Sequence, residues 1–252
     1  MSNNDKQKEL ETLFKAWEQK EPGKVSYISR GGEEKEIVIN HSNNNFIADG
    51  IVDENTWNSA NKKRILFVLK EAYGTDWDGK TLATWIENGF PYKGHTIWQR
   101  VARWTYGIQN TTDAHIQRYT PRLDETTTHR ECLEQIAVLN LKKSGGNKQS
   151  DYGEIAAYAD YDCEEIRKEI SLIDPEIVVC GSTFKTLYEK VYKREHMSAQ
   201  EKSDNWYYYI NLDGKERLYL DVYHPSNRWP DLMNYYMVTN VYQQALIEKA
   251  HR

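Results

Sequence analysis

Three short polar segments carry the residue types that could do chemistry in this sequence. One contains Glu71, the second opens with Asn140 and the third opens with His224. A carboxylate can position a water molecule, an amide offers a donor and an acceptor to the edge of a heterocycle, and an imidazole can stabilise a departing anion. We therefore predict that these three side chains converge on one site.

Four strands are expected to position these segments. Three continuous apolar runs are typical of strands buried on both faces of a parallel sheet, namely 64–69, 136–139 and 176–181. A fourth run, 217–223, is expected to pair with 206–210 across the Asp213-Gly214 turn. The polar segments follow the first, second and fourth runs, so we expect them at the carboxyl edge of the sheet.

Helical periodicity fills the intervals between the strands. Apolar residues recur at helical spacing over 155–173, and Asp174-Pro175 is expected to end that helix. Further helices are predicted at 5–19, 96–104, 183–192 and 230–250. The alternation predicts an α/β fold, a three-layer α/β/α sandwich around a central, mainly parallel four-stranded sheet.

The length and the ends of the chain bound its organisation. The 252 residues suffice for one large domain, which we place at 61–252 after an N-terminal accessory segment, 1–60, that forms either a cap or a disordered arm. The first twenty residues lack the pattern of a signal peptide, and no apolar run reaches membrane-spanning length. We expect a cytoplasmic monomer with no membrane contact.

Charge and composition give mixed indications about nucleic acid. The 33 basic and 38 acidic residues leave a net charge of −5, which does not by itself suggest a nucleic-acid binder. Local cations, such as Lys142 and Arg228, lie in the polar segments, and 8 Trp with 18 Tyr could supply stacking surfaces as well as core. The three cysteines are widely spaced, so we expect free thiols and no metal site.

The segment 70–74, Lys-Glu-Ala-Tyr-Gly, resembles the water-positioning motif of the uracil-DNA glycosylase superfamily. The resemblance extends in order and spacing over about 64–241. By that match Glu71 takes the place of the water-activating acid, and Tyr73 the place of a ring whose bulk excludes the thymine methyl group. The superfamily implies DNA as the partner and a base flipped out of the helix.

Two further segments match base-binding parts of the same superfamily. Residues 89–94, Gly-Phe-Pro-Tyr-Lys-Gly, are similar to a segment whose aromatic ring stacks on the flipped base, which assigns that role to Tyr92. Residues 138–142 resemble the strand that ends in an Asn reading the Watson–Crick edge of uracil, which assigns that role to Asn140. The stretch 174–182 matches a part that carries fold and little chemistry.

His224-Pro225-Ser226 looks like the second catalytic motif, in which the His donates a hydrogen bond to the base as the glycosidic bond breaks. Arg228 and Trp229 then take the place of the loop that enters the minor groove. With these, the resemblance implies a DNA-contacting set made of Lys70, Lys142, Ser226, Arg228 and Trp229.

Two departures from the superfamily pattern leave alternatives open. Lys70 replaces a Gly or Gln, and its charge could neutralise Glu71 or contact phosphate. The cysteines of the iron–sulfur branch are absent, so no cofactor is implied. Taken singly, Glu71 reads equally well as a loop acid and Asn140 as a turn former. For His224 alone a surface residue is the favoured interpretation, and for Tyr92 alone core packing is favoured.

Two functions follow from these residues. The first is a monofunctional DNA glycosylase that hydrolyses the N-glycosidic bond of uracil or a related deaminated base. The second is a non-catalytic member that keeps the site to bind a nucleobase, a nucleotide or single-stranded nucleic acid.

Overall fold

The computed structural model describes residues 3–42, 46–74, 81–88, 95–146, 148–193 and 206–251. Its strands are β1 (Gly23–Ile28), β2 (Glu34–Ile39), β3 (Gly50–Ile51), β4 (Ile65–Tyr73), β5 (Ile136–Gly146), β6 (Ile177–Gly181), β7 (Tyr207–Leu212) and β8 (Lys215–Val222). Its main helices are α1 (Asn3–Glu18), α2 (Glu54–Trp57), α3 (Leu82–Glu87), α4 (Thr96–Asn110), α5 (Thr126–Leu133), α6 (Tyr152–Tyr161), α7 (Cys163–Ile173), α8 (Phe184–Thr186) and α9 (Asp231–Ala250). Short helical turns follow at Pro121–Asp124 and Leu187–Val191.

The central sheet has six strands in the order β3-β5-β4-β6-β8-β7. The four strands expected from the sequence form its parallel middle, β5-β4-β6-β8, and β7 pairs with β8 as the predicted hairpin. The prediction of a four-stranded sheet is nevertheless wrong, because β3 and β7 add antiparallel edges. A strand as short as β3 has no periodicity that a sequence pattern could detect.

Two strands run further than their apolar cores indicated. β4 and β5 continue to pair beyond the level at which β6 ends, with Glu71 opposite Lys142 and Tyr73 opposite Gly146. Glu71 and Asn140 therefore lie inside strands and not in the loops after them. These polar residues were not predicted as strand, because the extension is defined by backbone hydrogen bonds between β4 and β5 and not by a run of apolar side chains.

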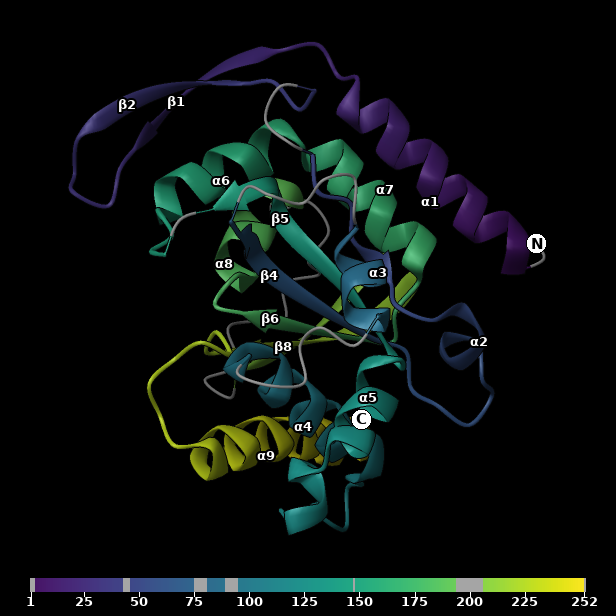
Figure 1. Cartoon of the computed structure of the whole chain (residues 1–252). Helices are drawn as coiled ribbons and strands as arrows, with labels where there is room; N and C mark the ends of the chain where they lie inside the picture. Colours follow the sequence, from purple (N-terminus) through teal and green to yellow (C-terminus); the bar gives the residue numbers. More distant parts are fainter. Residues whose placement is uncertain are drawn as a thin grey trace.

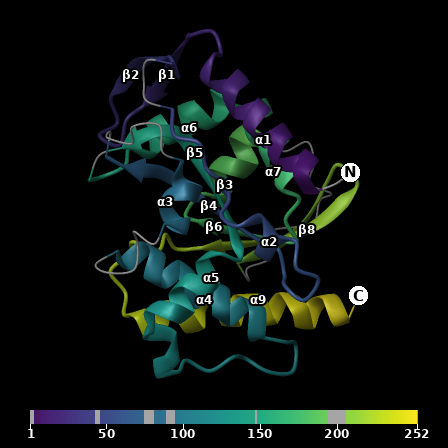
Figure 2. The same cartoon turned by 45° about the vertical axis from the view of Figure 1, so that its right-hand side comes forward.

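Helices cover both faces of the sheet (Figures 1 and 2). Side chains of β4 alternate between the faces: Phe67 and Leu69 belong to a core with α3, α4, α5 and α9, whereas Leu66 and Val68 belong to a core with α1, α6 and α7. Both cores are built from buried side chains. The α/β class with helices on each side of a largely parallel sheet is thus confirmed.

The long helix expected over 155–173 is two helices. α6 ends at Tyr161 and α7 begins at Cys163, with Asp162 between them. The fully buried carboxylate of Asp162 lies 3.0 Å from Nε2 of His41 and 3.3 Å from Nζ of Lys20. These contacts from the N-terminal segment could not be read from local periodicity, which continues unbroken across the junction.

The N-terminal segment packs on the rest of the chain through α1 and β3. Leu10 and Trp17 of α1 are buried in the core that contains α7, and β3 pairs with β5. By contrast, β1 and β2 form a separate two-stranded sheet that extends away from the central one in Figure 1. The domain boundary at residue 60 stays a prediction, and α1 is an ordered helix.

Asp174 lies among four positively charged side chains at the amino edge of the sheet. It has φ 53° after α7, a conformation that Asp and Asn tolerate better than most residues, and Pro175 follows it. Its carboxylate lies 2.8 Å from Lys215, 3.1 Å from Arg217, 3.3 Å from Arg64 and 3.7 Å from Lys6. Burial alone would raise the pKa of Asp174, but the Lys215 hydrogen bond and the neighbouring cations outweigh it and lower the pKa.

We expect Asp174→Asn to destabilise the fold by about 2 kcal/mol at neutral pH, because it leaves the buried Arg217 without its counter-charge. Asn keeps the backbone conformation, so the change isolates charge. Since the folded-state pKa of Asp174 is lowered, its contribution is complete above about pH 4 and disappears as the pH falls through the folded pKa. Urea unfolding at several pH values tests this.

The control is Asp113→Asn, at an exposed carboxylate that accepts a hydrogen bond from the next backbone N–H. Its free energy of unfolding should match that of the wild type. Equal stability of Asp174→Asn and wild type at pH 7 would contradict the role assigned to the cation cluster.

Candidate functional site

The structure places most predicted site residues at the carboxyl edge of the parallel strands. Glu71 lies near the end of β4, Asn140 lies in β5, and His224 follows β8. β8 is three strands away from β5, so about 14 Å of sheet separates the latter two backbones. Tyr92 lies outside the described residues. The sharing of one cleft by these side chains stays a prediction.

Glu71 is held by an ion pair from the neighbouring strand. Its Oε2 accepts a hydrogen bond from Nζ of Lys142 at 2.9 Å, and the same ammonium lies 2.7 Å from Oε1 of Glu154 on α6. Burial would lower the pKa of Lys142, but its hydrogen bonds to Glu154 and Glu71 raise the pKa. Lys142 is therefore a firmly charged partner of two carboxylates, and it is Lys142, not Lys70, that compensates Glu71.

Gly146 makes room for the carboxylate of Glu71. A Cβ atom built at Gly146 would lie 2.0 Å from Cδ of Glu71, well inside the closest approach of real atoms. The two residues meet because β5 continues to Gly146 alongside the end of β4. A side chain at this position would have to displace the head of Glu71.

The loop after β8 fixes the tautomer of His224. The backbone N–H of Ser226 donates to Nδ1 of His224 at 3.1 Å, and the Ser226 hydroxyl lies 2.7 Å from the same atom. A backbone N–H can only donate, so Nδ1 is the unprotonated nitrogen of a neutral ring. The ring proton of the neutral form then lies on Nε2, which makes that atom a hydrogen-bond donor.

The surroundings of His224 keep the ring neutral. Burial, together with the nearby positive charge of Lys70, lowers the pKa of His224 to about 3. The ring is also close to Gly181, where an added Cβ would lie 3.5 Å from Cδ2 of His224 and 3.0 Å from Leu69. A neutral donor in a confined position suits stabilisation of an anion without prior protonation.

Arg100 of α4 holds the same loop from beneath. Its guanidinium donates to the carbonyl oxygens of Pro225, Asn227 and Trp229 at 2.9, 2.5 and 2.8 Å, and Nε donates to Asp231 at 2.6 Å. The buried Arg100 thus fixes three carbonyl groups within five residues. Sequence reasoning missed it, because an Arg in an amphipathic helix carries no signal of its long-range partners.

Asn140 is buried with one polar group unsatisfied. Only 2% of the residue is exposed, and its backbone N–H donates to Oδ2 of Asp49 at 2.6 Å. Within the part of the chain that the structure describes, Nδ2 of Asn140 has no hydrogen-bond partner. An unpaired buried donor is costly, so this amide is suited to meet an acceptor from a bound molecule.

The remaining predicted residues divide into exposed and buried ones. Tyr73 is 75% exposed and Trp229 44%, and Ser226 and Arg228 are exposed as well. Nζ of Lys70 lies 5.1 Å from the ring centroid of Tyr152. Lys142 was expected to contact a DNA phosphate, but it is buried and its ammonium contacts two carboxylates.

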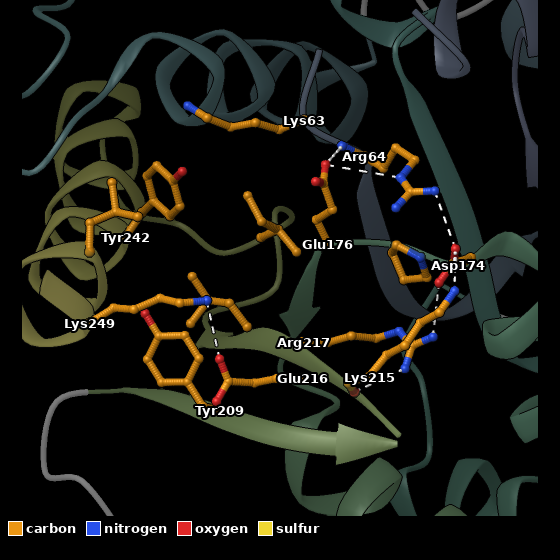
Figure 3. Close-up of a pocket in the computed structure, with 14 residues that line it drawn as sticks. Lys63, Arg64, Asp174, Glu176, Tyr209, Lys215, Glu216, Arg217, Tyr242 and Lys249 are labelled. Atoms are coloured by element: carbon orange, nitrogen blue, oxygen red, sulfur yellow. Dashed lines mark hydrogen bonds and ion pairs between the residues drawn. The ribbon is translucent and has the colours of Figure 1, made fainter. Parts of the chain in front are cut away.

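A pocket of about 470 Å³ opens at the opposite, amino edge of the sheet (Figure 3). Tyr209 and Tyr242 contribute rings to its lining, and several of its charged groups pair with one another, as in the 3.1 Å contact of Lys249 with Glu216. Asp174 and its cations form another part of the wall. The lining includes none of the predicted site residues, so the chemistry we predicted is not located there.

A scan against protein-family models and a search of curated proteins find no match to this chain. Across the described ranges, no group of three or more His, Cys, Asp or Glu side chains could hold a metal ion. The three cysteines are buried free thiols, as expected. No helix in the same ranges is long and apolar enough to span a membrane.

We predict that the ring of His224 stays neutral on acidification to about pH 4, because burial and Lys70 together hold its pKa near 3. Lys70→Met removes one of the two causes and should raise the pKa towards the ordinary value of about 6.5. Side-chain NMR titration of the histidines, over the pH range in which the protein stays folded, measures both.

Lys8→Met, on the exposed face of α1, is the matched control and should leave the His224 titration unchanged. A wild-type midpoint near pH 6.5, or no response to Lys70→Met, would refute the electrostatic description of this loop.

Proposed function

We propose that this chain is a DNA glycosylase acting on uracil or a related deaminated base. The observation that carries the proposal is His224, a neutral ring whose Nδ1 is occupied by Ser226 and whose Nε2 is therefore a fixed donor at the strand ends. The unsatisfied amide of Asn140, three strands away along the same edge of the sheet, supports it. The resemblance of segments 70–74, 138–142 and 224–226 to the uracil-DNA glycosylase superfamily gives the reaction class.

The reaction breaks the bond between the sugar C1′ and the base nitrogen. The electron pair of that bond leaves with the base as an anion, and Nε2–H of His224 donates a hydrogen bond to the base oxygen on which charge builds up. Water then supplies its oxygen to C1′. The proton that water loses passes to the carboxylate of Glu71 and on to solvent, and solvent protonates the departing base.

Lys142 determines how Glu71 can act. It engages Oε2 at 2.9 Å, so we assign the water to Oε1. The carboxylate is thereby held in one orientation at the strand end, and its negative charge also offsets the positive character of the sugar in the transition state. Lys142 is a positioning residue in this scheme, in place of the phosphate contact expected from the sequence.

Asn140 supplies recognition. Its free Nδ2–H group would pair with a carbonyl oxygen on the base edge, and an exocyclic amine in that position would leave two donors facing each other. Uracil, hypoxanthine and xanthine carry a carbonyl where cytosine, adenine and guanine, respectively, carry an exocyclic amine. Discrimination in favour of deaminated bases follows from this single donor.

A second function is a binding module that keeps the site without turnover. The ion pair between Glu71 and Lys142 favours it, because a carboxylate engaged by a cation is a weaker base towards water. The net charge of −5 favours weak or transient contact with DNA. Release of free base in a single-turnover assay separates the two functions.

We expect His224→Ala to slow base release by on the order of a hundredfold with little change in DNA binding, since the lost donor acts mainly in the transition state. Glu71→Gln should also slow release, whereas Asn140→Ala should weaken base recognition as well. Single-turnover excision from a uracil-containing single strand measures these rates. If the wild type releases no uracil, hypoxanthine or xanthine, the binding module takes the place of the enzyme.

Gly146→Ala offers a test that leaves every polar site residue in place. The new methyl group would occupy the position of the Glu71 carboxylate, and because that carboxylate ends a flexible side chain, it can move while the fold persists. We expect slower base release at nearly unchanged melting temperature. Gly31→Ala, at a position where an added Cβ lies 3.8 Å from its nearest neighbour, is the control; equal rates for the two variants would remove Glu71 from the mechanism.

A further inference from the structure

Exposed aromatic side chains gather at one edge of the sheet. Among the described residues six aromatic side chains are exposed, and five of them lie at or next to the carboxyl ends of the parallel strands: Tyr73, Tyr152, Trp206, Tyr223 and Trp229. The sixth, Tyr236, is on α9. Large rings left in water at a single edge indicate a binding surface and not a core.

Three of these rings form a continuous row beside His224. The ring centroids of Trp206 and Tyr223 are 5.1 Å apart, and those of Tyr223 and Trp229 are also 5.1 Å apart. Their exposed fractions are 41%, 39% and 44%. We call Trp206, Tyr223 and Trp229 the aromatic row.

The backbone at Trp206 is held in an unfavourable conformation. Its φ is 65°, a region that bulky residues seldom adopt, and its carbonyl oxygen accepts a hydrogen bond from the backbone N–H of Asp221 at 2.9 Å. This conformation sets the indole against the ring of Tyr223. A strained backbone beneath an exposed ring is a second, independent indication that the ring takes part in binding.

The other end of the row is fixed by the His224 loop. Arg100 donates to the carbonyl oxygen of Trp229, and Asn227 Oδ1 accepts from the backbone N–H of Trp229 at 2.9 Å. Cations flank the row, with Arg228 exposed next to Trp229 and Lys70 close enough to act on the pKa of His224. Rings combined with cations suit an anionic chain that carries flat heterocycles.

We propose that the aromatic row is a stacking platform for unpaired bases of single-stranded DNA that flank the base entering the site. The inference rests on the proposed function, which supplies DNA as the substrate, and adds a subsite and a strand preference to it. Base stacking tolerates any sequence because every base has a π face, and it needs few phosphate contacts. It therefore explains how a chain with net charge −5 can bind DNA.

Substitutions in the aromatic row can distinguish a nucleobase from an apolar protein surface as its occupant. A nucleobase stacks on an aromatic ring, whereas an apolar surface can pack against any apolar side chain of similar volume. We would replace Trp206, Tyr223 and Trp229 singly with Leu and singly with Phe. The probe is a fluorescently labelled oligothymidylate of about twenty nucleotides without uracil, bound by the full chain and followed by anisotropy. Val38→Ala, at an exposed apolar position on β2, is the control.

Each Leu variant should weaken binding on the order of tenfold, the Phe variants should stay within about threefold of wild type, and Val38→Ala should not differ from it. The slope of affinity against salt concentration should be the same in all variants, since stacking releases no counterions. Duplex DNA of the same length should show no such difference between Leu and Phe.

Leu variants that bind as tightly as wild type, or an equal loss in the Leu and Phe series, would overturn the platform. A wild type that fails to bind the oligothymidylate would do the same. The proposed function and the stacking platform can fail separately. Ring-dependent binding without any base release would support the platform and contradict the glycosylase function. Base release with ring-independent binding would support the glycosylase function and contradict the platform. Melting temperatures of all variants establish that the fold is retained.

Discussion

The structure depends on the compensation of one buried charge. Lys143 of β5 is fully buried, with its ammonium 2.7 Å from Glu169 of α7 and hydrogen-bonded to Asp49, and both carboxylates are fully buried too. Burial would lower the pKa of Lys143, but the two acids raise it; burial and the nearby Asp49 raise the pKa of Glu169 well above its usual range. The raised pKa of Glu169 favours its protonated form, which lowers the net charge that the protein interior must accommodate around Lys143.

That cluster connects the N-terminal segment with the candidate site. Asp49 immediately precedes β3. Its carboxylate accepts hydrogen bonds from the ammonium of Lys143 and from the backbone N–H of Asn140. The aromatic rings of Trp17 and Phe14 on α1 lie 5.0 and 5.6 Å from the same ammonium. The residues before position 60 are consequently part of the environment that places Asn140, although they supply no group to the proposed chemistry.

Features that adjacent residues encode could be predicted from the sequence, whereas features that depend on contacts between distant residues could not. The apolar cores of β4, β5, β6 and β8 and the stop at Asp174-Pro175 were predictable, because adjacent residues encode them. The polar segments after these cores were also placed at the correct edge. The edge strand β3, the division between α6 and α7, the Lys142 partner of Glu71 and the support from Arg100 were not predictable, since each arises from residues far apart in the chain.

Arg100 and the carbonyl oxygen of Pro225 are separated by 125 positions in the chain. The guanidinium in α4 therefore meets its acceptors only when distant parts of the chain have come together. Closing so long a loop is entropically expensive, and α9, which begins directly after the His224 loop, packs beside α4. The shape of this loop is thus set by contacts from Arg100 and not by residues 223–230 alone, so a change that loosens α4 from α9 would alter the loop without touching it.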